Sequence, residues 1–151
     1  MYSQTITIFN RKEGSSGDTW YPTVLKNVNL EMDRAAILAK YGAQSSDNAV
    51  LHVPFVTDKS GDILIGGKQW FPPKAWDAQP DHSKIVTFTP GDRFDFFWLG
   101  DWGSTEPVYD TDFVADMDFY THMNRLYDYV FAISSVGGPY QLIPHFEIMG
   151  K

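Results

Sequence analysis

Residues 66–99, GGKQWFPPKAWDAQPDHSKIVTFTPGDRFDFFWL, alternate short β-forming segments with turn residues, and this alternation decides the fold class. The apolar run Ile63–Ile65 leads into Gly66-Gly67, a two-residue connection in which both residues can take positive φ. Residues 68–71 can then return antiparallel to the first run. Pro72-Pro73 ends the pairing because neither proline has a backbone N–H to donate. The stretch therefore predicts a β-hairpin near the middle of the chain.

The second half of the stretch predicts two further strands and one helical turn. Residues 74–79 have room for a single turn of helix, and residues 84–89 and 94–99 are apolar enough to form strands. Between these strands, Pro90-Gly91-Asp92 is a turn signal, since proline presets φ and glycine can take positive φ. The middle of the chain is thus predicted to be strands joined by tight turns.

Aromatic residues are unusually frequent, at 16% of the 151 residues. Aromatic side chains favour half-buried pleated surfaces, and burial is their default role in a small β-protein. We therefore interpret Trp70, Trp76 and Phe88 as structural core, with the two tryptophans packed over the central strands.

The rest of the chain continues this pattern. Strands are predicted at residues 5–9, 19–28, 49–56, 129–136 and 142–149, short helices at residues 34–41 and 119–129, and a turn at Gly137-Gly138-Pro139. These elements predict a mainly β fold, a small single-domain β-barrel or sandwich over residues 1–151 with one or two short helices. An α+β sheet with both helices on one side is the alternative.

Charge and cysteine content exclude several classes of protein. The net charge is −7, and an acidic surface gains nothing from counterion release on DNA, so direct, sequence-independent duplex binding is disfavoured. We also expect no sequence-specific nucleic-acid binding. The absence of cysteine excludes disulfides and thiolate metal sites. No apolar run approaches the roughly 20 residues that a spanning helix needs, and the N-terminus has no secretory pattern. We therefore expect synthesis in the cytoplasm and no membrane association.

The acidic residues concentrate in residues 101–118, where six carboxylates occur without any Lys or Arg. Such a run is tolerated most easily in a solvated loop, where salt screens the repulsion. Acidic loops also steer docking to basic patches on a partner. We therefore expect an exposed, mobile loop, with Asp110, Asp112, Asp116 and Asp118 as candidate partner-interface residues.

Residues that could be catalytic or bind a metal are explained equally well by structural roles in turns, ion pairs and the core. The tripeptide Asp81-His82-Ser83 has the letters of a hydrolase triad, but adjacent residues cannot form such a relay, and a capped turn is expected. Asp118 and His122 are spaced i, i+4 on the predicted helix, which a surface ion pair explains. His52 and His145 lie among apolar residues, as histidines bonded to backbone at the core or rim do.

A calcium site at Asp110 and Asp112 is disfavoured, because the spacing lacks the loop glycine and the bidentate glutamate of an EF-hand. The glycine pairs likewise lack the spacing of a phosphate-binding loop. The sequence thus predicts no catalytic residues, no cofactor and no metal.

Several short phrases resemble a family of small tailed-phage and prophage proteins encoded among the head–tail connector and minor capsid genes. The matching phrases are KQWFPPKAW at residues 68–76, FTPGD at residues 88–92, TITIFN at residues 5–10, WYPTVLKNV at residues 20–28, VFAISSV at residues 130–136 and PHFE at residues 144–147. The resemblance implies a non-enzymatic virion subunit that joins a ring at the portal, with portal, connector and tail proteins as partners. An acidic channel lining would let duplex DNA slide without sticking.

Two other functions remain open. A carbohydrate-binding β-sandwich could use exposed Trp20, Trp98 or Trp102, and a coplanar row of these rings would favour it. A small enzyme with an Asp/His site around Asp118 and His122 would need a cleft that joins them to other groups.

Overall fold

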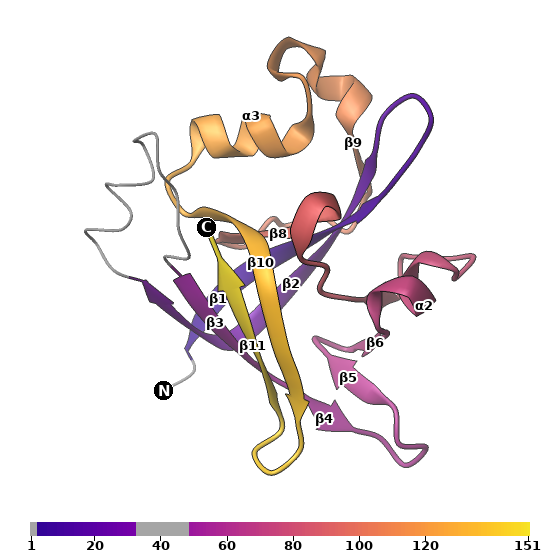
Figure 1. The fold of residues 1–151 in the computed structure, drawn as a ribbon, viewed down its shortest axis with the longest axis vertical. Helices are drawn as coiled ribbons and strands as arrows, with labels where there is room; N and C mark the ends of the chain where they lie inside the picture. The colour runs from indigo at the N-terminus through magenta and orange to yellow at the C-terminus, as the bar shows by residue number, and fades with distance from the viewer. Residues whose placement is uncertain (1–2, 33–48) are drawn as a thin grey trace.

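The computed structural model describes residues 3–32 and 49–151, which form a mainly β fold with 47% strand and 17% helix (Figure 1). Six antiparallel strands close into a barrel, so the predicted fold class is confirmed, and of the two predicted forms the structure is the barrel. Around the wall the strands are β1 (Gln4–Lys12), β8 (Phe96–Leu99), β10 (Val130–Tyr140), β11 (His145–Gly150), β3 (Ala49–Pro54) and β2 (Thr19–Met32).

Strand β2 closes the barrel because it pairs with two different strands of the barrel along its length. Its first part pairs with β1, from Thr19 opposite Lys12 to Val28 opposite Gln4. Its last part, from Asn29, pairs with β3 instead. Asn27 lies just before this change with φ of 59°, a left-handed conformation that Asn tolerates better than most residues. The bend at this point lets one long strand turn the corner of the barrel.

A second, smaller sheet lies at one end of the barrel. It contains β4 (Val56–Thr57), β5 (Ile63–Ile65), β6 (Lys68–Trp70) and β7 (Ile85–Val86), in that order. The hairpin predicted around Gly66-Gly67 is confirmed: β5 and β6 are antiparallel, and φ is 58° and 79° at the two glycines. A Cβ on Gly66 would also lie 2.7 Å from Leu25 Cδ2, so glycine lets this turn approach the wall.

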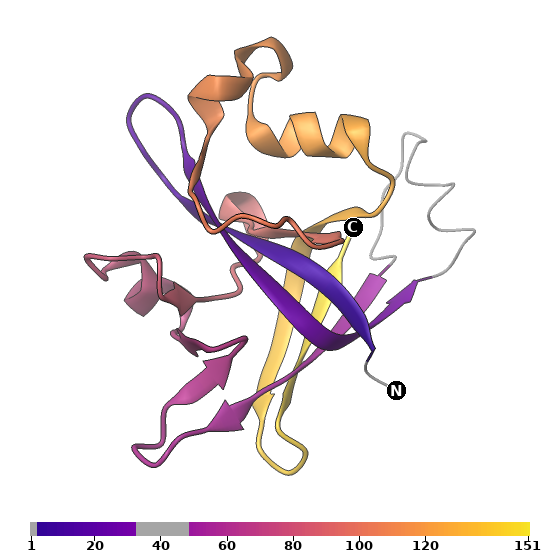
Figure 2. The same cartoon turned by 180° about the vertical axis from the view of Figure 1, so that it is seen from behind.

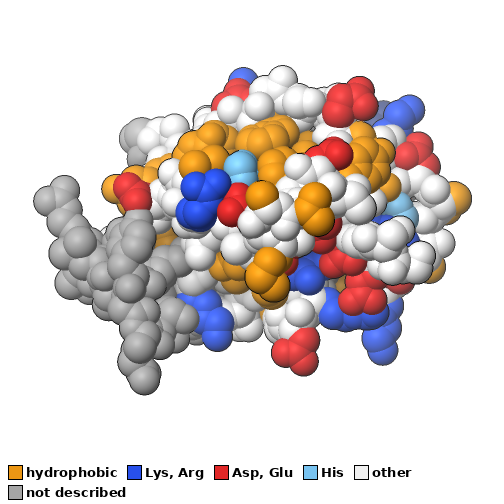
Figure 3. Space-filling view, turned by 90° about the horizontal axis from the view of Figure 1, so that it is seen from above, with side chains coloured by type: hydrophobic (Ala, Val, Ile, Leu, Met, Phe, Trp, Pro, Cys, Tyr) orange, Lys and Arg blue, Asp and Glu red, His pale blue; other side chains and the backbone are white. Residues whose placement is uncertain are grey.

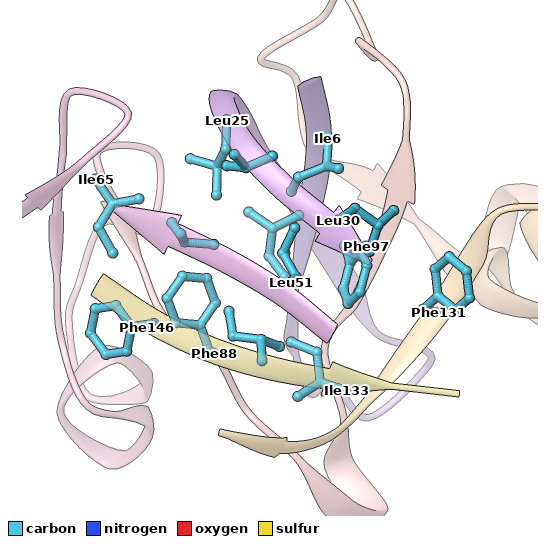
Figure 4. Packing of buried hydrophobic residues seen from close by; sticks show 14 of the residues in the cluster. Ile6, Leu25, Leu30, Leu51, Ile65, Phe88, Phe97, Phe131, Ile133 and Phe146 are labelled. Carbon is cyan, nitrogen blue, oxygen red and sulfur yellow. The ribbon is translucent and has the colours of Figure 1, made fainter. Parts of the chain in front are cut away.

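The main core fills the barrel and extends under the small sheet. Leu51 and Ile148 from adjacent strands are fully buried, and Phe88 and Phe146 pack edge to face with ring centroids 5.2 Å apart (Figure 4). Ile65 of the small sheet belongs to the same cluster. The two sheets therefore share one hydrophobic core.

A second cluster lies on the outside of the barrel, under helix α3 (Phe119–Leu126). Five consecutive residues of β1 are buried, because Ile6 and Ile8 face the barrel interior while Phe9 faces outward against Phe119. Helix α3 therefore covers one side of the barrel (Figure 2). The remaining short elements are α2 (Pro73–Asp77), η1 (Gly91–Arg93), β9 (Val108–Tyr109) and η2 (Asp110–Asp116).

Three sequence predictions need correction or lie outside the described residues. The turn predicted at Gly137-Gly138-Pro139 is wrong: these residues belong to β10, and the register shift between Gly137 and Tyr140 shows that they form a bulge. The strand predicted over residues 84–89 shortens to β7, because the Asn10 side chain bonds the Thr87 backbone where a ladder partner would be. The predicted helix at residues 34–41 falls in the undescribed segment.

None of the helices in residues 3–32 and 49–151 has the length and apolar character to span a bilayer.

Candidate functional site

The acidic stretch is largely tied to the protein instead of forming a free loop, and Asp110 is its main anchor. One Asp110 carboxylate oxygen accepts hydrogen bonds from Trp20 Nε1 at 2.7 Å and from the Phe119 backbone N–H at 3.0 Å. The other accepts from the Asp18 backbone N–H at 3.1 Å. Asp110 thus joins the β1–β2 hairpin to the start of α3, so its first role is structural.

Two further carboxylates of the stretch also have partners within the chain. Asp116 accepts hydrogen bonds from Arg125 and from His122 Nδ1. These hydrogen bonds lower the pKa of Asp116, and the one from Arg125 has the larger effect. Asp118 caps α3 by accepting from the Thr121 backbone N–H at 2.7 Å. His122 therefore forms its ion pair with Asp116, whereas the spacing suggests Asp118, whose side chain caps the helix.

The expectation of a wholly solvated loop over residues 101–118 is thus wrong for its second half, where η2 forms. Asp112 is the one of the four candidate interface residues whose side chain is exposed. Asp110, Asp116 and Asp118 have local hydrogen-bond partners, which weakens the electrostatic argument for a mobile loop in this half of the stretch.

The three predicted core aromatics occupy different depths. Trp76 and Phe88 are each 2% exposed, whereas Trp70 is half-buried and packs on the barrel core against Phe146. The Nε1 atoms of both Trp70 and Trp76 are buried without a hydrogen-bond partner.

The tryptophans named for carbohydrate stacking do not form a flat platform. Trp20 is buried, and the rings of Trp98 and Trp102 are perpendicular, with centroids 6.1 Å apart. Both rings are partly covered by the cluster under α3. This geometry adds no support to the carbohydrate-binding alternative.

Asp81-His82-Ser83 forms the capped turn that its sequence suggests. Asp81 accepts from both the backbone N–H and the hydroxyl of Ser83, and these bonds lower the pKa of Asp81. The buried His82 ring donates to the Trp76 carbonyl oxygen at 2.9 Å. The three side chains therefore do not form a catalytic relay.

Asp95 is a buried carboxylate that the sequence did not single out. It is 1% exposed and accepts hydrogen bonds from Asn10 Nδ2 and from the backbone N–H groups of Arg11 and Thr89, at 2.8–2.9 Å. Burial raises the pKa of Asp95 to about 7, and the hydrogen bonds offset only part of that effect. This network ties β1 to the segment before β8, so it supports the barrel.

A histidine–carboxylate cluster lies on the outer wall, formed by His52, His145 and Glu147. Each residue offers one ligand-type atom, and the three atoms lie within 4.8 Å of one another. Glu147 Oε1 is 3.8 Å from His52 Nδ1 and 3.5 Å from His145 Nε2. The sequence did not predict this cluster, although alternation along the two predicted strands places these residues on the face opposite the core.

Exposed apolar side chains gather at two opposite ends of the molecule. At the end formed by η2 and α3, Val114 and Met117 are 79% and 82% exposed, and hydrophobic side chains lie among acidic ones there (Figure 3). Met117 also has φ of 78°, a strained conformation for a residue with a side chain. At the other end, the turn between β10 and β11 carries Leu142 and Ile143, which are 97% and 70% exposed (Figure 1).

The fold and these features define a small closed antiparallel β-barrel with two apolar ends and a histidine–carboxylate cluster on its wall. The whole chain, residues 1–151, matches DUF6751, a family of unknown function, and the chain belongs to that family. No curated protein and no solved structure matches the chain.

Proposed function

We propose that the protein is a non-enzymatic structural subunit of a tailed-phage or prophage virion, which docks at the head–tail junction. The observation that carries the proposal is the pair of exposed apolar ends, because the η2–α3 region and the β10–β11 turn lie on opposite sides of the barrel (Figure 1) and each carries strongly exposed apolar side chains. Large apolar side chains this exposed are unfavourable in water, and contiguous patches of them mark interaction surfaces.

Two different surfaces at opposite ends suit a head-to-tail contact between copies of the chain. Such heterologous contacts build rings when the rotation closes. The proposed partner of the Leu142–Ile143 turn is therefore the η2–α3 end of a neighbouring copy in a ring on the portal. The resemblance of the sequence phrases to connector and minor capsid proteins supports the same assignment.

The experiment is co-expression with the neighbouring portal, connector and tail genes, followed by a count of tail-joined particles. Leu142→Asp should lower that count strongly without changing the melting temperature of the isolated protein, because its side chain packs on nothing in the monomer. Ala78→Asp is the matched control, since it adds the same charge at an exposed position outside both apolar ends and outside the acidic stretch, and it should leave joining intact. Absence of the protein from purified particles would refute the proposal.

A further inference from the structure

We propose that His52, His145 and Glu147 form a binding site for a divalent transition-metal ion such as Zn²⁺. Two imidazoles and one carboxylate are a common donor set for such ions in proteins. The site does not depend on the proposed virion function, because it rests on the geometry of three side chains on one face of the barrel wall.

The strand register places these residues together. His52 on β3 lies directly opposite Glu147 on β11 in an antiparallel pair. His145 is two residues before Glu147, and residues i and i+2 of a strand project from the same face. The inward-facing Leu51, Val53 and Phe146 between them are buried, so the three ligands point outward.

The separations suit one ion bound between the three groups. Two ligands of a tetrahedral Zn²⁺, each about 2.0–2.1 Å from the metal, stand roughly 3.3 Å apart. Glu147 Oε1 is already 3.5 Å from His145 Nε2 and 3.8 Å from His52 Nδ1. These spacings exceed a hydrogen bond, and all three ligand atoms lie within 4.8 Å of one another, so side-chain rotation has to bring them closer for one ion to bind.

The second nitrogen of each imidazole supports the same assignment. His52 Nε2 lies 3.2 Å from Glu31 Oε2, and a carboxylate can only accept, so this nitrogen donates. His145 Nδ1 likewise donates to the Ile143 carbonyl oxygen. In the neutral form in which an imidazole binds a metal, each ring would then offer its other nitrogen, His52 Nδ1 and His145 Nε2, and these are the atoms nearest Glu147 Oε1. One divalent cation can be shared by these three groups.

Glu31 and the Ile143 carbonyl would thus act as the outer partners that fix the tautomer and orientation of metal-binding histidines. Imidazole ligands favour Zn²⁺ and similar ions over Ca²⁺ and Mg²⁺, which prefer oxygen. Three protein ligands leave at least one coordination position for water. A bound ion would join β3 to the base of the β10–β11 hairpin and so fix the turn that carries Leu142.

The test is metal titration of the full chain, without a histidine tag and after treatment with a chelator. Calorimetry with Zn²⁺ and visible absorption with Co²⁺ should show one equivalent bound, and Mg²⁺ should not compete. His52→Asn, His145→Asn and Glu147→Gln should each lower the affinity at least tenfold, and Glu31→Gln should lower it roughly 10–100-fold.

His122→Asn is the matched control, because His122 pairs with Asp116 away from the cluster, and this variant should bind like the wild type. Circular dichroism confirms that each variant is folded, which is expected because the substituted side chains lie on the outer face. Failure of the wild type to bind one equivalent of Zn²⁺ or Co²⁺, or equal binding by all variants, would overturn the proposal.

Discussion

Replacing the buried Asp95 by asparagine should change how the stability of the protein depends on pH. Burial raises the pKa of Asp95 to about 7 from an ordinary value of 3.8. Between these two pH values, the folded protein keeps a proton that the unfolded chain has lost. The unfolded state therefore binds fewer protons, and the free energy of unfolding falls as the pH rises through this range.

The size of the effect follows from the two pKa values. At about 1.4 kcal/mol per pH unit, the interval between the two pKa values corresponds to a loss of about 4 kcal/mol in the free energy of unfolding. This loss is absent below pH 3.8 and complete above pH 7. This is a large part of the roughly 5–15 kcal/mol that stabilises a typical domain. Asp95→Asn removes the titrating group, so the variant should lack this part of the pH dependence.

The assay is urea unfolding followed by circular dichroism at several pH values between 4.5 and 7.5. Asparagine can accept at one end only, so the variant also loses the hydrogen bond from Arg11 or the one from Thr89 at every pH, and only the change of stability with pH is diagnostic. Asp92→Asn, which removes an exposed carboxylate from the same segment, should keep the wild-type fall. Equal pH dependence in the wild type and Asp95→Asn would refute the reasoning.

Two further predictions concern single side chains. Trp76→Ala should lower the free energy of unfolding by about 3–5 kcal/mol, because it empties a buried aromatic site, and an unchanged urea midpoint would contradict this. Asp110→Asn should cost about 1–3 kcal/mol, because the amide cannot accept at both ends from Trp20, Asp18 and Phe119. Asp112→Asn, the exposed control, should stay within about 0.5 kcal/mol of the wild type, and equal effects of the two changes would show that Asp110 has no structural role.

The sequence predicted the fold class and the central hairpin, because alternation and turn chemistry are local properties. It failed where a distant residue decides the local structure. The β7 strand ends early because Asn10, 77 residues away, bonds the Thr87 backbone. Gly137, Gly138 and Pro139 predict a turn that reverses the chain, but in the structure they form a bulge inside the long strand β10.

The acidic stretch shows the same limit for charge patterns. A count of carboxylates predicts repulsion, but it cannot show that Trp20 and Arg125 are close enough to bond Asp110 and Asp116. Once these partners are known, Asp110 and Asp116 have structural roles that account for their presence in the stretch. Only its exposed residues, Asp112 among the four predicted, remain available to a partner.

The histidine–carboxylate cluster was hidden for a related reason. The spacing of His145 and Glu147 shows that both face one side of a strand, but two ligands on one strand are weak evidence for a site. The third ligand, His52, comes from a strand about 90 residues earlier, and only the pairing of β3 with β11 brings it opposite Glu147. A metal site on a sheet surface therefore depends on strand order and register. Neither can be derived from this sequence alone, and both are known only from the structure of the barrel.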